Sequence, residues 1–124
     1  MADEQYELGM KVRREVLGGA HVDRAEANKT KFTERFQDFI TRYAWGHVWG
    51  NDTLSRRERS IVTLSVLTAL NREHEIPMHI RAAIGNGLTP DEIAEVLLHT
   101  AVYAGVPVAN DALKLGQQVL NELS

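Results

Sequence analysis

The chain contains no cysteine, and this absence excludes several kinds of chemistry. Disulfide bonds, zinc–thiolate centres and thiol nucleophiles all require cysteine. No apolar run reaches the roughly 18 residues that a membrane-spanning helix needs. Sustained alternation of apolar and polar residues, the pattern of a half-buried strand, is also missing. We therefore expect a helical protein that does not cross a membrane and uses no thiol chemistry.

Positive charge is scarce as well, because 14 Lys and Arg residues stand against 17 Asp and Glu residues. General nucleic-acid binders usually carry a basic patch and a high isoelectric point, so no nucleic-acid partner is expected. A length of 124 residues suits one domain over residues 1–124. The opening residues are acidic and lack the apolar core of a signal peptide, which predicts a cytoplasmic protein.

Helical periodicity and capping residues predict an all-α, single-domain bundle of about six helices. Gly18 and Gly19 end the first helix, and a capping box of Thr89 and Glu92 starts the fifth. The polar residues 20–30 are interpreted as a connection that can include a short turn of helix. The predicted helices span approximately residues 4–17, 31–45, 56–70, 77–85, 90–103 and 108–120.

An aromatic stripe follows the period of the second predicted helix, and packing in the core is its ordinary explanation. Trp45 and Trp49 come at the end of that helix. They form either a hydrophobic plug or the wall of a pocket or subunit contact, since aromatic residues are enriched at both. The stripe consists of Phe32, Phe36, Phe39, Ile40 and Tyr43.

The helices predicted over residues 56–70 and 90–103 are apolar on nearly every side, the first of them in its second half. A helix that is hydrophobic all round is buried all round. In so short a chain, we expect other subunits to pack on these helices. Arg56, Arg57 and Arg59 crowd the start of the first one, either as a solvated face or as a contact to an anionic ligand.

A dense polar segment, residues 71–81, directly follows the most apolar run of the chain. Helical spacing places Glu75 and His79 on one face, at i and i+4. A carboxylate beside an imidazole fixes its tautomer and favours its protonated form, which suits general acid–base catalysis. An exposed surface pair is the alternative interpretation.

The other histidines give weaker signals. His99 lies within the apolar helix of residues 90–103, where a core histidine bonded to a backbone carbonyl is the simpler interpretation. His74 and His79 are the only histidines close in sequence, at i and i+5. This separation differs from the i,i+4 pair of helical zinc sites, so no metal is expected.

Four segments together carry a family resemblance: Trp45-Gly46-x-Val48-Trp49, Arg59-Ser60-Ile61-Val62-Thr63, Arg72-Glu73-x-Glu75-x-x-Met78-His79-Ile80-Arg81 and Leu98-His99-x-x-x-Tyr103-Ala104-Gly105-x-Pro107. They resemble the 4-carboxymuconolactone decarboxylase family, over essentially the whole chain. The resemblance implies an all-helical, alkylhydroperoxidase-D-like fold and no cofactor. It also implies an oligomer, commonly a homohexamer built as a trimer of dimers.

Peroxidases of the same superfamily carry Cys-x-x-Cys-x-x-x-His on the equivalent helix. Matching that histidine to His79 places Arg72 and Glu75 at the two cysteine positions, and the upstream glutamate of the motif falls on Ser60. The chain therefore lacks the thiols and the proton relay of these peroxidases. This departure excludes their activity and favours the decarboxylase branch.

The family's substrate is a butenolide with one carboxylate on the ring carbon beside the ring oxygen and another on an acetate arm. Loss of carbon dioxide leaves negative charge, which the ring double bond relays to the lactone carbonyl. The resemblance implies that 4-carboxymuconolactone becomes 3-oxoadipate enol-lactone, in the protocatechuate branch of the β-ketoadipate pathway. No cofactor is needed, because the substrate is its own electron sink.

This chemistry assigns candidate roles. His79, oriented by Glu75, is the proton donor or enolate stabiliser, and His99 is the second donor. Arg72 and Arg81 hold the substrate carboxylates, with Arg59 behind them, because guanidinium groups bind carboxylates through two hydrogen bonds. The candidate substrate-binding residues are Arg72, Arg81, Arg59, Tyr103 and Trp45.

Two other interpretations stay open. A relative that acts on another lactone or a β-keto acid, as a hydrolase or isomerase, could use the same pocket. A non-catalytic helical oligomer that binds an anionic metabolite or a partner protein is the other possibility. Closure of Glu75 and His79 into one pocket, rather than exposure to open solvent, would count against the non-catalytic interpretation.

Overall fold

A computed structural model describes residues 3–124, and within this range the chain forms helices and turns without a strand. The predicted all-α class is confirmed. The chain divides into two compact units, Met1–Ser55 and Arg56–Ser124. None of the helices in the described range combines the length and apolarity of a membrane span. The single domain expected over residues 1–124 stays a prediction.

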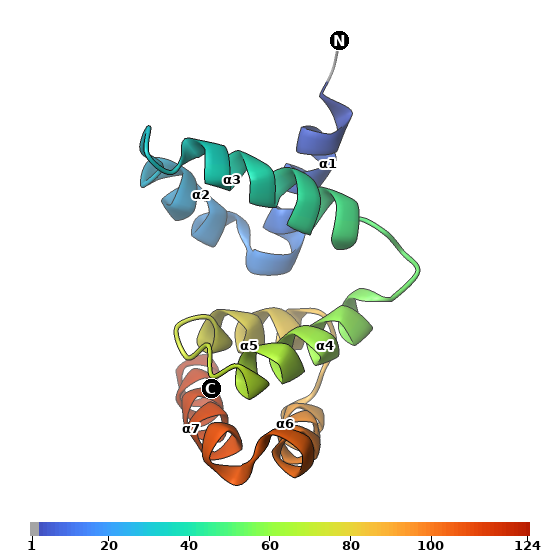
Figure 1. The fold of residues 1–124 in the computed structure, drawn as a ribbon, viewed down its shortest axis with the longest axis vertical. Helices are drawn as coiled ribbons and strands as arrows, with labels where there is room; N and C mark the ends of the chain where they lie inside the picture. The colour runs from blue at the N-terminus through green and yellow to red at the C-terminus, as the bar shows by residue number, and fades with distance from the viewer. Residues whose placement is uncertain (1–2) are drawn as a thin grey trace. The chain divides into compact units, whose positions relative to one another are not determined.

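The first unit contains α1 (Glu4–Leu17), α2 (Gly19–Ala27), α3 (Glu34–Ile40) and the π-helix η1 (Thr41–Val48) (Figure 1). η1 continues α3 and packs along α1. The two backbones approach so closely that a Cβ on Gly9 would lie 1.8 Å from the carbonyl oxygen of Thr41. Only glycine fits there. The buried apolar residues of this unit are Val12, Val16, Val22 and Trp45.

Arg13 is the charged residue of this small core, and it is only 4% exposed. Its guanidinium donates to Oε1 of Gln37 at 3.2 Å and to Oγ1 of Thr41 at 3.5 Å. Burial lowers the pKa of Arg13, because desolvation penalises the charged form. These bonds join α1 to the point where α3 changes into η1.

The second unit contains α4 (Arg56–Ala69), α5 (Ile76–Gly85), α6 (Pro90–Ala104) and α7 (Val106–Leu123) (Figure 1). α4 packs against α5 and α6, and α7 packs against α5 and α6. Gly105 has a φ of 113°, which lets the chain turn sharply from α6 into α7. The core consists of Leu64, Ile76, Ile80, Ala83, Leu88, Ile93, Leu97, Ala112 and Val119.

The predicted capping box sets the start of α6. Thr89 Oγ1 accepts a hydrogen bond from the Glu92 backbone N–H at 3.2 Å, and Glu92 Oε1 accepts one from the Thr89 N–H at 2.9 Å. Pro90 and Pro77 occupy the first turns of α6 and α5, where a missing N–H costs little. The helices predicted over residues 4–17, 56–70, 77–85 and 90–103 are confirmed within one or two residues.

Other helix predictions need correction. Residues 20–30 are mostly α2, because Gly18 reverses the chain with a φ of 92° and fully buried Val22 anchors the new helix. The second predicted helix begins three residues late, since Thr30 and Thr33 form a turn, and its second half is a π-helix. The last helix extends beyond 108–120 at both ends. The described residues form seven α-helices and one π-helix, rather than about six helices.

The core interpretation of the aromatic stripe is wrong for this chain. Phe32 is 96% exposed, and Phe36, Phe39 and Tyr43 are exposed as well. The periodicity correctly indicates one helical face, but that face is turned to the surface. The rings of Phe39 and Tyr43 lie against each other, with their centroids 5.1 Å apart.

The two almost wholly apolar helices are not covered on every side within the single chain, and the packing of other subunits on them stays a prediction. The four-helix unit covers only the inner faces of these helices. Val62, Val66 and Leu70 of α4 are exposed, and so are Leu98 and Val102 of α6.

Candidate functional site

A pocket of about 370 Å³ lies between α4 and α6. Arg57, Ile61 and Ser65 reach it from successive turns of α4, because residues four apart share one helical face. The mixture of apolar walls and a few polar groups is typical of small-molecule sites. The lining residues are Arg57, Ile61, Ser65, Leu88, Glu92, Glu95, Val96 and His99.

His99 lines this pocket from α6. Its side chain is exposed, so the interpretation of a core histidine is wrong. Tyr103, one helical turn later, stacks on the imidazole with ring centroids 5.5 Å apart and an interplanar angle of 25°. The structure therefore brings together two of the predicted site residues, His99 and Tyr103.

Arg57 and Glu92 form an ion pair at the same pocket. Nη1 of Arg57 donates to Oε1 of Glu92 at 2.8 Å and to the Gly87 carbonyl at 3.1 Å, while Nη2 donates to Oε2 of Glu92. This pairing, helped by the cap bond from Thr89, lowers the pKa of Glu92 to about 2. The Arg57 guanidinium is thus already held by protein oxygens.

The polar segment after α4 forms a second pocket of about 270 Å³. Asn71 adopts a left-handed φ of 55°, a conformation that asparagine tolerates, and the Arg72 N–H donates to the Leu67 carbonyl at 2.8 Å. The side chains of residues 71–75 are all exposed. The pocket is lined by Asn71, Arg72, Glu73, His74 and Glu75, and so it brings together two predicted site residues.

Glu75 and His79 keep their i,i+4 relation at the start of α5. Glu75 is the residue directly before the helix, and its backbone carbonyl accepts the His79 N–H at 3.2 Å. The Glu75 side chain is exposed, whereas His79 is half-buried. The orientation of the His79 imidazole by the Glu75 carboxylate stays a prediction.

The remaining predicted residues lie elsewhere. Arg81 of α5 forms an ion pair with Glu122 of α7, and both side chains are partly exposed. Arg59 is half-buried on α4. Trp45 is buried in the first unit, where its ring centroid lies 5.3 Å from that of Trp49.

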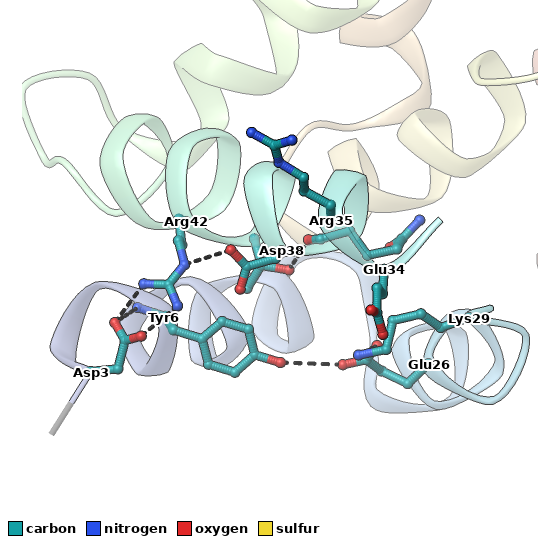
Figure 2. Close-up of a pocket in the computed structure, with 10 residues that line it drawn as sticks. Asp3, Tyr6, Glu26, Lys29, Glu34, Arg35, Asp38 and Arg42 are labelled. Atoms are coloured by element: carbon teal, nitrogen blue, oxygen red, sulfur yellow. Dashed lines mark hydrogen bonds and ion pairs between the residues drawn. The ribbon is translucent and has the colours of Figure 1, made fainter. Parts of the chain in front are cut away.

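The first unit has a polar pocket of its own, of about 450 Å³ (Figure 2). Arg42 donates to Oδ2 of Asp38 at 2.8 Å and pairs with both carboxylate oxygens of Asp3. These bonds raise the pKa of Arg42 and lower that of Asp3. Figure 2 shows Arg35 directed away from this cluster. Because its charges are largely paired with one another, we regard the pocket as structural.

No three His, Asp or Glu side chains within residues 3–124 come together in a way that could hold a metal ion. The predicted histidines, carboxylates and arginines of the site lie on α4, α5 and α6 and in the turn between α4 and α5. Together these features define a class of protein: a small all-helical chain with a histidine in a mixed polar and apolar pocket.

The chain belongs to the carboxymuconolactone decarboxylase family, whose model matches residues 34–118. It is 48% identical over 124 residues to a 4-carboxymuconolactone decarboxylase of Acinetobacter baylyi, covering 99% of this chain and 92% of the relative. It is 41% identical over 118 residues to a nitrosuccinic acid decarboxylase of Metarhizium robertsii, covering 95% and 82%. These matches confirm the family resemblance of the four sequence segments.

Sequence reasoning misses Glu95, which lines the pocket one helical turn before His99. The available signal was a carboxylate and a histidine at i and i+4, the same spacing that singles out Glu75 and His79. The bond between Arg57 and Glu92 is also missed, because 35 residues separate them and only the packing of α4 on α6 brings them together.

Proposed function

We propose that this chain catalyses the cofactor-free decarboxylation of 4-carboxymuconolactone to 3-oxoadipate enol-lactone and carbon dioxide, in the protocatechuate branch of the β-ketoadipate pathway. The observation that carries the proposal is the 48% identity, over 99% of the chain, to a relative of that name. The pocket with His99 supports it, since the reaction needs a donor beside a largely apolar surface.

The reaction requires few protein groups. Breaking the carbon–carbon bond leaves an electron pair on the ring carbon beside the ring oxygen, and the ring double bond relays it to the lactone carbonyl. A proton added to the carbon next to that carbonyl completes the product. The protein must bind a dianion, stabilise an enolate oxygen and deliver this proton. A preorganised hydrogen-bond donor to such an oxygen lowers the activation barrier by roughly 3 kcal/mol. A positioned acid raises the rate about 100- to 10,000-fold.

We assign proton delivery or enolate stabilisation to His79, oriented by Glu75, and assign the second donor role to His99. The half-buried position of His79 in the first turn of α5 supports its role, because partial shielding from water strengthens its interactions. The place of His99 in the pocket, with Tyr103 against its ring, supports the other assignment.

The substrate carboxylates are assigned to Arg72 and Arg81, with Arg59 behind them, and the pocket wall to Tyr103; the role predicted for Trp45, in the first unit, stays a prediction. The exposure of Arg72 supports its role. Arg81 is paired with Glu122, so it must exchange this carboxylate for that of the substrate. Such an exchange is inexpensive, because exposed ion pairs contribute little stability.

Nitrosuccinic acid is a second candidate substrate, favoured by the 41% identity to the decarboxylase named for it. Its nitro group can accept the electron pair as the lactone carbonyl does. The same donors and clamps would then serve both reactions.

The test is turnover of each compound by the purified protein after exhaustive chelation, followed by ultraviolet absorbance and by released carbon dioxide. We expect rapid consumption of the lactone with one carbon dioxide released per molecule, and much slower turnover of nitrosuccinate. Ring opening without carbon dioxide would support the hydrolase interpretation instead. Binding of the lactone without turnover would support the non-catalytic one.

We also propose that the chain assembles into a homohexamer, a trimer of dimers, in the cytoplasm. The exposed apolar residues of α4 and α6 support this proposal, as does the exposed aromatic stripe of α3 and η1, because large exposed apolar patches mark interaction sites. Light scattering should give the mass of six chains of 13.9 kDa. A monomer that persists at micromolar concentration would contradict the proposal.

A further inference from the structure

Two carboxylates line the pocket between α4 and α6, and they differ in their partners. Glu92 accepts hydrogen bonds from the Arg57 guanidinium and from the Thr89 N–H. Glu95 has no cationic partner within the part of the chain that the structure describes, although it faces the same pocket. The pocket therefore contains one carboxylate with a clear structural role and one without.

Glu95 and His99 lie one turn apart on the same face of α6, and both line the pocket. Tyr103 stacks on the imidazole from the following turn. Stacking covers a face of the ring but leaves its edge accessible, and the edge carries both nitrogen atoms. The imidazole can therefore donate in its plane to a carboxylate while Tyr103 limits its rotation.

The polar groups on the α4 side of the pocket cannot compensate Glu95. Arg57 is committed to Glu92 and Gly87, and Ser65 Oγ donates to the Ile61 carbonyl at 2.8 Å. Apart from His99, the other lining residues are apolar. An uncompensated carboxylate would repel a dianionic substrate, because like charges repel each other and an apolar wall supplies no positive charge to offset this repulsion. His99 is the remaining lining group that can pair with Glu95.

We propose that Glu95 is a positioning residue for His99, an inference that rests on the proposed function. When the substrate displaces water from the pocket, the Glu95 carboxylate accepts a hydrogen bond from one ring N–H of His99. This bond fixes the tautomer and directs the other ring nitrogen toward the substrate. When the ring carries a second proton, this other nitrogen donates to the substrate, and the positive charge of the ring offsets the charge of Glu95.

Steady-state kinetics of five variants test this role. Glu95→Gln should lower kcat by about tenfold, less than the loss of an acid itself, and should leave KM within about twofold. Glu95→Asp should recover part of the rate, because it retains the charge. In a His99→Gln background, Glu95→Gln should lower kcat by less than about twofold, since no imidazole is left to orient. Asp91→Asn is the matched control, because Asp91 is an exposed carboxylate of α6 outside the pocket and should leave kcat unchanged.

A second readout does not depend on turnover. Nitrogen NMR of the His99 ring, recorded at a pH where the ring is neutral and with succinate bound as a non-reacting dicarboxylate, should show one tautomer in the wild type and a mixture in Glu95→Gln. Unchanged tautomers would overturn the proposal. A lower KM with unchanged kcat in Glu95→Gln would also overturn it, because Glu95 would then be only a source of repulsion toward the substrate. An inactive wild type would overturn the proposed function itself, whereas an active wild type matched by Glu95→Gln would remove only the positioning role.

Discussion

Arg57, in the first turn of α4, holds the carboxylate of Glu92, in the first turn of α6, with Nη1 2.8 Å from Oε1. The same carboxylate accepts the Thr89 N–H, so Glu92 both caps α6 and ties it to α4. Because both residues line the pocket that contains His99, this pair fixes the spacing of the two pocket walls.

The pair predicts a pH dependence of stability. The pKa of Glu92 falls from 4.5 to about 2 in the folded chain, mainly through the hydrogen bonds from Arg57. A carboxylate whose pKa is lower in the folded state stabilises the fold above its unfolded pKa. This contribution is lost as the pH falls from the unfolded pKa to the folded pKa. The Tm of the wild type should therefore fall more steeply between about pH 5 and pH 2.5 than the Tm of Glu92→Gln. Circular dichroism measures both, and parallel curves would contradict the prediction.

Gly9→Ala should destabilise the first unit. Its Cβ would lie 1.8 Å from the Thr41 carbonyl oxygen, and a backbone atom cannot move aside cheaply. Overpacking of this kind costs about 1–3 kcal/mol, which corresponds to a Tm lower by roughly 3–10 °C. Gly85→Ala is the matched control, because nothing lies within 4 Å of its added Cβ. An equal effect of the two substitutions on thermal unfolding would refute the close approach of η1 to α1.

The catalytic pair predicts a specific pattern of kinetics. His79→Ala should lower kcat about 100- to 10,000-fold while the circular dichroism spectrum stays unchanged. Glu75→Gln should lower kcat by less than His79→Ala does, since the amide still accepts a hydrogen bond but does not stabilise imidazolium. The double variant should be scarcely worse than His79→Ala, because the two residues act as one unit. A folded His79→Ala enzyme within about threefold of the wild-type kcat would transfer the chemistry to His99 or elsewhere.

The ion pair of Arg81 and Glu122 predicts opposite effects on substrate binding. Arg81→Lys should chiefly raise KM, because lysine lacks the paired donors that bind a carboxylate. Glu122→Gln should lower KM by a few-fold, since it releases Arg81 from a competing carboxylate. Initial rates over a range of lactone concentrations measure both. If Glu122→Gln raises KM instead, Arg81 is a structural residue and not a clamp.

Local chemistry made much of the fold predictable. The capping box of Thr89 and Glu92 marks the start of α6 in the sequence, and the structure forms both of its hydrogen bonds. In contrast, α2 depends on the burial of Val22 against other elements, which no local pattern records. The stripe of Phe32 and Phe36 shows the same limit, because periodicity reveals that residues share a face but not what that face contacts.

The candidate site was predictable by residue type more than by arrangement. The helical spacing of Glu75 and His79 survives at the start of α5, and His99 lies beside Tyr103 as the sequence spacing allows. The commitment of Arg81 to Glu122 could not be predicted, because it depends on the packing of α7 beside α5.

Turnover of 4-carboxymuconolactone in D₂O, followed by proton NMR at early times, tests the central claim most directly. The account predicts 3-oxoadipate enol-lactone with one deuterium on the carbon next to the lactone carbonyl, and one carbon dioxide released per lactone consumed. This outcome requires both the relay of the electron pair through the ring and its protonation at the far end. Deuterium on the ring carbon that loses the carboxylate, or product formed without carbon dioxide, would contradict the account.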